Sequence, residues 1–451
     1  MGTPSPARTA AYHALRAIAG GVDLPAALAR SRERLGDDRD RALTADIVAG
    51  TLRWRRSLEF LIEHVAARPL ARIDPDVAHI LALSLYQLLH LDRVPASAVV
   101  DDAVDLARYA HKRSATTFVN AVLRSTLRLR HRLPLPPRPA SAGDRDAALA
   151  YLGVTHSHPA WLVARWLDRH GFDATERWVR FNNETPSLTL RVNTLRASRE
   201  AVAAALASHD IGTAPTPHAP DGLIVTAGNP LRAPLDGSFL VQDEASQLVS
   251  LTVGARPGER ILDLCASPGG KTVALAADMR DAGMLVASDV RPRRVRLLRD
   301  IVRTSGTVCV RLVHVPASGD LPFTSRFDRV LVDAPCSGLG TIRRDADLRW
   351  RRREEDLPLL ARDQLALLLR AAAVVRPGGR LVYATCSSEP EENDAVVEAF
   401  AAARPDFARV DLRADGVPSI ASLVDGRGVL RTLPFAHGLE AFFAAALIRR
   451  D

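Results

Sequence analysis

The first 130 residues of the chain carry apolar side chains at helical spacing almost throughout. In residues 40–54, apolar positions recur about every three to four residues, which is typical of one face of an amphipathic helix. Asp74 precedes Pro75, the arrangement of a capping residue with proline at the first helical position. The pattern predicts helices over residues 8–19, 24–34, 40–54, 77–89, 98–109 and 115–127.

The pattern changes after residue 130. Residues 131–144 are rich in proline, with Pro134, Pro136 and Pro137 close together, and this composition favours a semi-rigid, extended linker. Helical spacing returns over 151–183. A small α+β subdomain is expected next, with strands at 188–193, 222–225 and 238–241 and a helix at 198–209.

From about residue 250 to the end, short apolar runs alternate with helical patterns. The runs that read as strands are 261–264, 284–288, 308–313, 329–332 and 380–384, followed by an antiparallel pair at 428–432 and 441–448. This alternation predicts a mostly parallel sheet with helices on both faces. The predicted division is an all-α domain at 1–130, a linker at 131–150, an α+β subdomain at 151–245 and an α/β domain at 246–451.

Composition limits which classes of binding partner and which cellular compartment are expected for the protein. Lys and Arg number 60 against 52 Asp and Glu, a net charge of +8 that favours a polyanion such as RNA, although a proteome-wide basic bias gives the same balance. The four cysteines are far apart, which fits a reducing compartment and no zinc site. Without an apolar run of about 18 residues or a signal-peptide pattern, we expect a cytoplasmic monomer with no membrane or metal partner.

One turn stands out by its chemistry. Residues 261–264 are expected to form a buried strand, residues 266–270 a turn of small residues, and Lys271 opens a helix. Such a strand, glycine turn and helix N-terminus bring backbone N–H groups to a nucleotide-like ligand. Asp289, at the end of the next strand, is placed to bind ribose hydroxyls. A tight turn of any α/β fold is the alternative reading of the loop alone.

Three motifs follow one another in the α/β part: DLCASPGGKT at 263–272, DAPCSG at 333–338 and YATCS at 383–387. Together they resemble the RsmB/NOP2/Sun family of RNA (cytosine-5)-methyltransferases. The segments ALTADIVAGTLRW, ILALSLYQLLHLDRVPASAVVDDAV and FVNAVLR resemble the NusB-like RNA-binding domain of the RsmB branch. The resemblance implies a Rossmann-like class I methyltransferase domain, preceded by an all-α NusB-like domain and a small α+β subdomain.

The resemblance also implies the cofactor, S-adenosylmethionine, and where it binds. The residues that it assigns to the cofactor are Cys265, Ala266, Ser267, Pro268, Gly269, Gly270, Lys271, Asp289 and Asp333. The chain departs from the family after the third strand, where relatives usually carry an acidic residue. Pro316 stands there and offers no side-chain acceptor to the adenine amino group, unless Ser318 or Asp320 takes that place.

Methylation at C5 of cytosine needs a nucleophile that first adds to C6, because C5 is weakly nucleophilic. A thiolate suits this step because it both attacks and leaves. By resemblance Cys386 is the nucleophile, Cys336 assists product release, and Asp333 binds the cytosine edge. Both cysteines follow strands that we predict to be neighbours, about 4.8 Å apart. Cys265 and Cys309 read as buried small side chains.

The densest basic run, residues 342–353, follows the Cys336 loop. Arg343, Arg344, Asp347 and Trp350 match the family pattern RRxxDxxW, which implies contact with RNA phosphates beside a flipped base. A solvated helix start is the alternative. We therefore predict an S-adenosylmethionine-dependent enzyme that makes 5-methylcytosine in RNA, by resemblance 16S rRNA.

The sequence also bears on three other functions. Cytosine methylation of DNA would need Pro-Cys-Gln and Glu-Asn-Val motifs, which are absent. A non-catalytic RNA-binding or antitermination-like factor would not need both cysteines. Methylation of tRNA or another RNA stays open, because the sequence does not identify the target.

Overall fold

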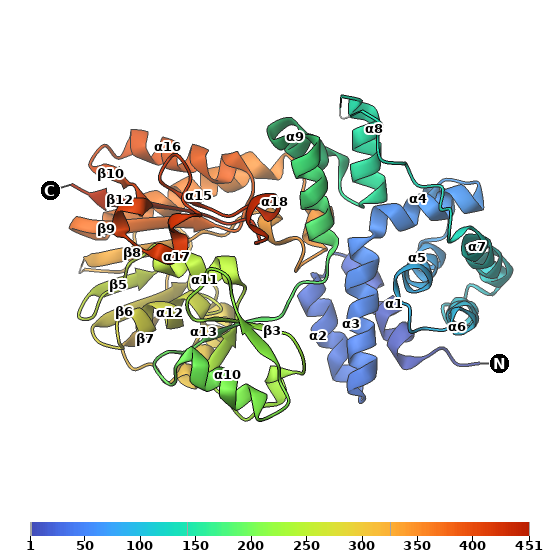
Figure 1. Ribbon diagram of the computed structural model, residues 1–451, viewed down its shortest axis with the longest axis horizontal. Helices are drawn as coiled ribbons and strands as arrows, with labels where there is room; N and C mark the ends of the chain where they lie inside the picture. The colour runs from blue at the N-terminus through green and yellow to red at the C-terminus, as the bar shows by residue number, and fades with distance from the viewer. Residues whose placement is uncertain (1, 142, 325, 451) are drawn as a thin grey trace. The chain divides into compact units, whose positions relative to one another are not determined.

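The computed structural model describes residues 2–141, 143–324 and 326–450. By contacts the chain forms two compact units. The helical unit comprises Met1–Glu184 together with Ile342–Arg352, and the sheet unit comprises Thr185–Thr341 together with Arg353–Asp451. Figure 1 shows the chain coloured from the N-terminus to the C-terminus. The short segment 342–352 therefore belongs by its contacts to the helical unit, although sheet-unit residues flank it in sequence.

The helical unit contains all six helices that the apolar spacing predicts. The helices described in it are α1 Pro6–Ala19, α2 Leu24–Arg34, α3 Asp38–Arg53, α4 Arg55–Ala66, α5 Pro75–His90, α6 Ala96–Tyr109, α7 Thr116–Leu129, α8 Arg145–Ala150, α9 Ala160–Asn183 and α14 Leu348–Arg351, with a 3-10 turn η1 at Leu70–Arg72. The predicted cap of α5 is confirmed, because the Asp74 carboxylate accepts the N–H of Asp76 at 2.9 Å. Helix α4 lies outside the predicted set. Apolar side chains from α1, α3, α4, α5, α6 and α7 form one core.

The proline-rich segment packs against this unit instead of standing apart as a spacer. Leu133 and Leu135 are half-buried against the helical core. The Thr155 hydroxyl donates to Pro136 O at 2.6 Å, and the Arg138 guanidinium donates to the buried Glu176. The segment expected to be a linker therefore packs against the helical core, because Leu133 and Leu135 bury apolar surface there. The compact unit continues to Glu184, past the predicted boundary at 150.

The sheet unit begins with a small antiparallel sheet in the order β2-β3-β1-β4. Its elements are β1 Thr189–Val192, α10 Arg199–Ala207, β2 Thr213–Pro215, β3 Gly222–Val225 and β4 Phe239–Val241. The predicted strands and helix of the small α+β piece are thus present, and β2 is an additional short strand. Leu190, Val192, Leu206 and Leu223 form its own small core.

A larger sheet follows, with strand order β10-β12-β9-β8-β5-β6-β7 and β11 paired to β12. The strands are β5 Arg260–Asp263, β6 Met284–Asp289, β7 Val310–His314, β8 Phe327–Asp333, β9 Val375–Thr385, β10 Phe407–Val410, β11 Leu430–Arg431 and β12 Phe443–Arg449. The run from β9 through β7 is parallel, and β12 pairs antiparallel with β9, β10 and β11. The five predicted parallel strands and the antiparallel end are confirmed.

Helices cover both faces of this sheet, as the alternation predicts (Figure 1). The helices and 3-10 turns used below are α11 Glu244–Leu251, α12 Gly270–Asp278, α13 Pro292–Ser305, α15 Asp356–Ala373, α16 Asp394–Ala403, η5 Leu339–Thr341 and η6 Pro390–Glu392. On β5, Ile261 packs with side chains of α11, α12 and α13, whereas the next residue, Leu262, packs with side chains of α15 and α16. Because successive strand residues point to opposite faces, both layers are buried. In the described part of the chain, no helix is long and apolar enough to cross a bilayer.

Candidate active site

The strand order places a switch point at β5. Strands β6 and β7 continue on one side of β5, and β8 and β9 continue on the other. In open parallel sheets, ligands bind beyond the carboxyl ends of the strands at such a point. The predicted loop 265–270 leaves β5 there and leads into α12. Gly269 has φ +121°, and a Cβ at this position would lie 2.9 Å from Leu298 Cδ1, so the turn requires glycine.

A pocket of about 130 Å³ lies on this loop. Its lining contains the predicted loop residues Cys265, Ala266, Ser267, Pro268, Gly270 and Lys271, together with Leu240, Val241, Gln242, Ser246, Asp263, Ile301 and Asp333. The structure therefore brings the loop and Asp333 together at one cavity. The space is concave and combines apolar walls with a few polar groups, as small-molecule sites do.

Asp263 lines the pocket and was not among the predicted site residues. Its carboxyl group is fully buried, Oδ2 accepts the Thr272 hydroxyl at 2.7 Å, and Oδ1 has no hydrogen-bond partner among the described residues. Burial raises the pKa of Asp263 to about 7, against the lowering effect of the Thr272 hydrogen bond. An unpartnered buried oxygen is costly, so it is a candidate acceptor for a ligand donor. The signal in the sequence that could have identified Asp263 as a site residue is its position at the end of the strand that precedes the glycine loop.

Asp289 lies at the end of β6, next to β5, and is 4% exposed. Its Oδ1 accepts the N–H of Arg291 at 2.9 Å, and Oδ2 lies 3.9 Å from the Arg294 guanidinium. Asp289 is thus at the predicted strand end but outside the lining of the pocket.

The loop that carries Pro316 is held by Arg370, which donates to Pro316 O at 2.9 Å.

Lys271 connects the cofactor loop to Asp333. Its ammonium group donates to Asp333 Oδ2 at 2.7 Å and to the Ser246 hydroxyl at 3.0 Å. Burial lowers the pKa of Lys271, but the Asp333 carboxylate outweighs burial and raises it above its ordinary value. The ammonium charge is therefore retained at neutral pH. The charged pair fixes the Asp333 carboxylate at the pocket wall.

The two predicted catalytic cysteines meet. Strands β8 and β9 are parallel neighbours with Asp333 opposite Ala384, and Cys336 Sγ lies 3.2 Å from Cys386 Sγ. Gly340 permits this approach of the two loops. Its N–H donates to Cys386 O at 3.0 Å, and a Cβ at Gly340 would lie only 2.0 Å from Ala441 O. The two strands are therefore neighbours, as predicted, and the two thiols lie close together.

The thiols differ in their surroundings. The hydrogen bond to Cys386 raises the pKa of the Cys336 thiol well above its ordinary value, and burial raises it further. At 3.2 Å either sulfur can be the donor of this hydrogen bond. Burial raises the pKa of Cys309 to about 12 and that of Cys265 well above its ordinary value. Neither forms a thiolate readily, which fits their predicted non-nucleophilic character.

The RRxxDxxW residues belong to the helical unit. Asp347 is 2% exposed, and burial raises its pKa to about 6. The Trp350 indole donates to Leu52 O at 2.6 Å, and the Arg343 guanidinium lies 4.2 Å from the Phe181 ring centroid. Arg344 is exposed. These contacts hold segment 342–352 in the unit, and RNA binding by these residues stays a prediction.

Arg349 of the same segment was not predicted to matter, yet its side chain is fully buried. It donates to four oxygen atoms: Ser157 O at 3.0 Å, Asn182 O at 3.1 Å, Asn183 Oδ1 at 3.0 Å and Arg53 O at 3.4 Å. The pattern RRxxDxxW does not identify Arg349, because this residue occupies one of its unspecified positions, between Asp347 and Trp350.

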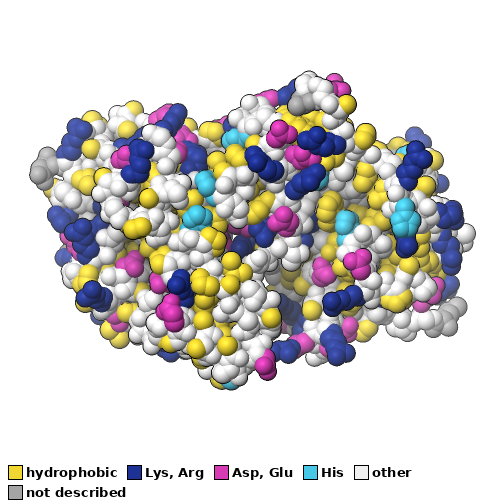
Figure 2. Space-filling view, viewed as in Figure 1, with side chains coloured by type: hydrophobic (Ala, Val, Ile, Leu, Met, Phe, Trp, Pro, Cys, Tyr) yellow, Lys and Arg dark blue, Asp and Glu magenta, His cyan; other side chains and the backbone are white. Residues whose placement is uncertain are grey.

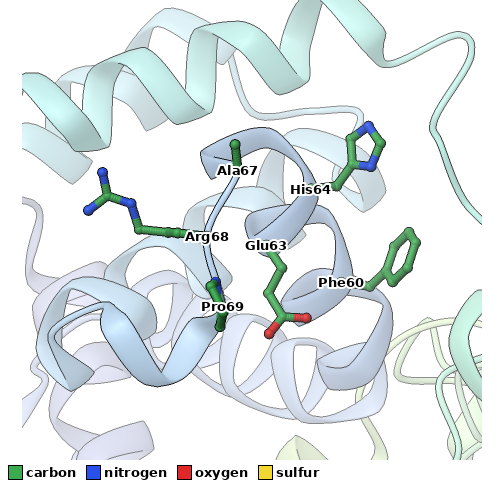
Figure 3. A pocket seen from close by; sticks show the side chains of 6 residues that line it. All are labelled: Phe60, Glu63, His64, Ala67, Arg68 and Pro69. Carbon is green, nitrogen blue, oxygen red and sulfur yellow. The ribbon is translucent and has the colours of Figure 1, made fainter.

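Two larger hollows are found among the described residues of the helical unit. One of about 440 Å³ is formed where α4 passes into η1 (Figure 3); its lining residues are Phe60, Glu63, His64, Ala67, Arg68 and Pro69. The second, of about 750 Å³, is formed by α1, α3, α4, α5 and segment 342–352. Neither contains a predicted catalytic residue. Figure 2 shows Lys and Arg side chains spread over the visible face, with acidic side chains between them.

Comparison with family models assigns most of the chain. Residues 250–448 match the model of the 16S rRNA methyltransferase RsmB/F. Residues 5–128 match the NusB family, and residues 158–232 match the ferredoxin-like domain of RsmF/B-like methyltransferases.

Individual proteins agree with these matches. The chain is 33% identical to ribosomal RNA small subunit methyltransferase B of Pseudomonas putida, covering 98% of both chains. It is 32% identical to the protein of the same name from Klebsiella pneumoniae, covering 92% of this chain and 91% of the relative. The crystal structure of PH0851 superposes with a TM-score of 0.80 at 26% identity and covers 99% of both chains. The predicted family, fold class and enzyme class are confirmed.

Proposed function

Because the chain belongs to the RsmB/F family of 16S rRNA methyltransferases, we propose that it methylates C5 of a cytosine in small-subunit ribosomal RNA, with S-adenosylmethionine as the methyl donor. The observation that carries this proposal is the pair of cysteine sulfurs 3.2 Å apart, at the ends of two strands beside the glycine-loop pocket. Two thiols in this position suit covalent activation of a pyrimidine ring.

The pocket residues fit this methyl donor. When bound, the donor supplies a methyl group made electrophilic by its positively charged sulfur. Gly270 lines the pocket without a side chain, and Asp263 offers a buried oxygen without a partner in the described chain. Asp289 would take the ribose hydroxyls, as the sequence predicts. Lys271 and Asp333 complete the wall on the side of the cysteines.

In this proposal the two cysteines act in different steps, Cys386 in the attack on the base and Cys336 in the release of the product. The Cys386 sulfur forms a bond to C6 of the cytosine, and the electron pair of the C5–C6 double bond moves into the ring. Asp333, held by Lys271, binds the N3 and N4 edge and favours its protonation. C5 then takes the methyl group, and the electrons of the broken methyl–sulfur bond stay on the donor sulfur. A water molecule takes the C5 proton, the electron pair left on C5 restores the C5–C6 double bond, and the C6–sulfur bond breaks with Cys386 leaving as a thiolate. Cys336, whose Sγ lies 3.2 Å from Cys386 Sγ, donates a proton toward the Cys386 sulfur and so stabilises the departing thiolate.

Methyl transfer from labelled donor to ribosomal RNA tests the proposal. Cys386→Ala is expected to lose transfer and to form no covalent complex. Cys336→Ala is expected to methylate and then to stall as a protein–RNA complex, visible on a denaturing gel and removed by nuclease. Full activity in both variants would contradict covalent catalysis, and the reverse pattern would exchange the two roles. Bisulfite sequencing of RNA from a deletion strain identifies the cytosine and separates ribosomal from transfer RNA. The expected cytoplasmic location and monomeric state stay predictions.

A further inference from the structure

Glu392 has no role in the chemistry described above, yet it lies directly beside it. It ends η6, the short turn that follows the Cys386 loop. Its side chain is fully buried. Burying a carboxyl group is costly unless hydrogen bonds compensate, so the partners of Glu392 show what it is there to hold.

Four donors converge on this carboxyl group. Oε1 accepts the backbone N–H of Ser337 at 2.8 Å and the Gln364 amide at 2.9 Å. Oε2 accepts the hydroxyls of Ser337 and Ser387, each at 2.5 Å. A carboxylate has about four acceptor sites, so its capacity is filled by these donors.

Two of these partners are the residues that immediately follow the cysteines. Ser337 follows Cys336 in the loop after β8, and Ser387 follows Cys386 in the loop after β9. The two hydroxyls also lie 3.2 Å from each other. One buried carboxyl group thus ties together two loops that come from different strands.

The next residue, Asn393, contacts a different set of loops from Glu392. The Asn393 side chain donates to Ser387 O at 2.9 Å and accepts the Thr385 hydroxyl at 2.5 Å. Asn393 therefore holds only the Cys386 loop, from both sides of the cysteine. Glu392 alone of the pair reaches the Cys336 loop.

We propose that Glu392 is a positioning residue that sets the separation of the Cys336 and Cys386 sulfurs by clamping Ser337 and Ser387. The proposal rests on the proposed function in so far as both thiols act on one cytosine. Reacting groups tolerate little misplacement, and a displacement of about 1 Å can cost about 100-fold in rate. Loss of the clamp moves Cys336 away from Cys386, so the step that needs both sulfurs, release of the adduct, slows most.

The first experiment needs neither RNA nor methyl transfer. Phenylarsine oxide bridges two nearby thiols: two arsenic–sulfur bonds form, and the oxide oxygen leaves as water with the two thiol protons. We expect tight capture by the unaltered protein, none by Cys336→Ala, and at least tenfold weaker capture by Glu392→Gln and Ser337→Ala. Holding two thiols in place raises their effective concentration, which is what the clamp supplies. Equal capture by all clamp variants would overturn the proposal, whatever the protein methylates.

The second experiment follows the reaction. Glu392→Gln and Ser337→Ala are expected to accumulate the covalent RNA complex at least tenfold over the unaltered enzyme, while single-turnover methyl transfer falls less. Asp281→Ala is the matched control, because the Asp281 carboxylate also holds a loop of this unit, through the N–H groups of Val308 and Cys309. The control should lose thermal stability without accumulating the complex. If Glu392→Gln does not fold, Ser337→Ala carries the test. Accumulation no greater than in Asp281→Ala would show a purely structural role.

Discussion

Single buried charges decide much of the chemistry at the glycine-loop pocket. Asp263 keeps one oxygen unpartnered while Lys271, Asp333 and Asp289 surround it electrostatically. Such a group destabilises the free protein and is available to a ligand. The stability of the protein and the affinity of the pocket should therefore respond to this residue in opposite directions.

Asp263→Asn should raise the melting temperature in a pH-dependent way. The native carboxyl group binds its proton up to about pH 7, because burial raises its pKa to about 7 from 3.8. Between these values the native state binds more protons than the unfolded chain, so stability falls as pH rises from about 4 to about 7. The full penalty, of the order of a few kcal/mol, is present above pH 7 and absent in the asparagine variant.

Melting curves of both proteins from pH 4 to pH 8 test this. Calorimetry of methyl-donor binding is the companion measurement, and weaker binding by Asp263→Asn is expected. A stability difference that is constant over the whole pH range would show that the carboxyl group titrates normally.

At the scale of elements, the sequence was informative where motif and periodicity agreed. The strands β5, β6, β8 and β9 were predicted because each joins an apolar run to a recognisable turn. The short edge strands β2 and β10 were missed, because three or four residues carry little periodicity. The division between α3 and α4 at Trp54 has no glycine or proline to signal it.

Contacts between distant segments account for the other misses. Glu392 and Arg349 act through partners that lie far away in the sequence, such as Ser337 and Ser157. One chain without an alignment does not reveal such pairs. Composition marks the proline-rich segment as a linker, but it does not show which surface Leu133 and Leu135 cover. The sequence singles out Cys336 and Cys386 because each lies in a motif, DAPCSG or YATCS, that directly follows a predicted strand.

Gly340→Ala tests how tightly the two cysteine loops pack. The added Cβ meets two backbone carbonyls, Ala441 O at 2.0 Å and Cys386 O at 2.8 Å, and neither can rotate away. Overpacking of this kind costs about 1–3 kcal/mol, and we expect at least the upper end together with a large loss of methyl transfer. Chemical denaturation gives the free energy of unfolding. Gly426→Ala is the control, because nothing lies within 4 Å of its Cβ position; equal behaviour of the two variants would contradict the tight contact.

Arg349→Met tests the anchoring of segment 342–352 in the helical unit. Burial lowers the pKa of Arg349 to about 9, which shows how strongly its charge is desolvated. Methionine removes this charge but leaves four oxygen atoms without their donor, and each unsatisfied buried acceptor costs about 1–3 kcal/mol. We expect a net loss of about 2–4 kcal/mol and faster proteolysis within the segment. Unchanged hydrogen exchange over residues 342–352 would show that other contacts hold it.

At the scale of the whole molecule, the compact units defined by contacts differ from the domains predicted from composition. The predicted all-α domain ends at 130, whereas the compact helical unit runs to Glu184 and includes Ile342–Arg352. Composition marks residues 131–144 as a spacer because of their prolines. The structure shows this segment packed against the helical unit, since the Thr155 hydroxyl donates to Pro136 O at 2.6 Å and Leu133 packs against the helical core. The helical unit is therefore larger than the all-α domain predicted from composition, and it includes a segment that lies between sheet-unit residues in the sequence.

Fragments of the chain test this last point. A fragment of residues 1–184 should be more stable to urea than one of residues 1–130, because the shorter piece loses the cover of Leu133 and Leu135. A synthetic peptide of residues 342–352 should raise the melting temperature of fragment 1–184, because binding to the native state alone shifts the folding equilibrium. The same peptide with Arg349→Met should have a much smaller effect, since it lacks the four hydrogen bonds. If neither peptide changes the melting temperature, segment 342–352 is held by its covalent neighbours and not by the helical unit.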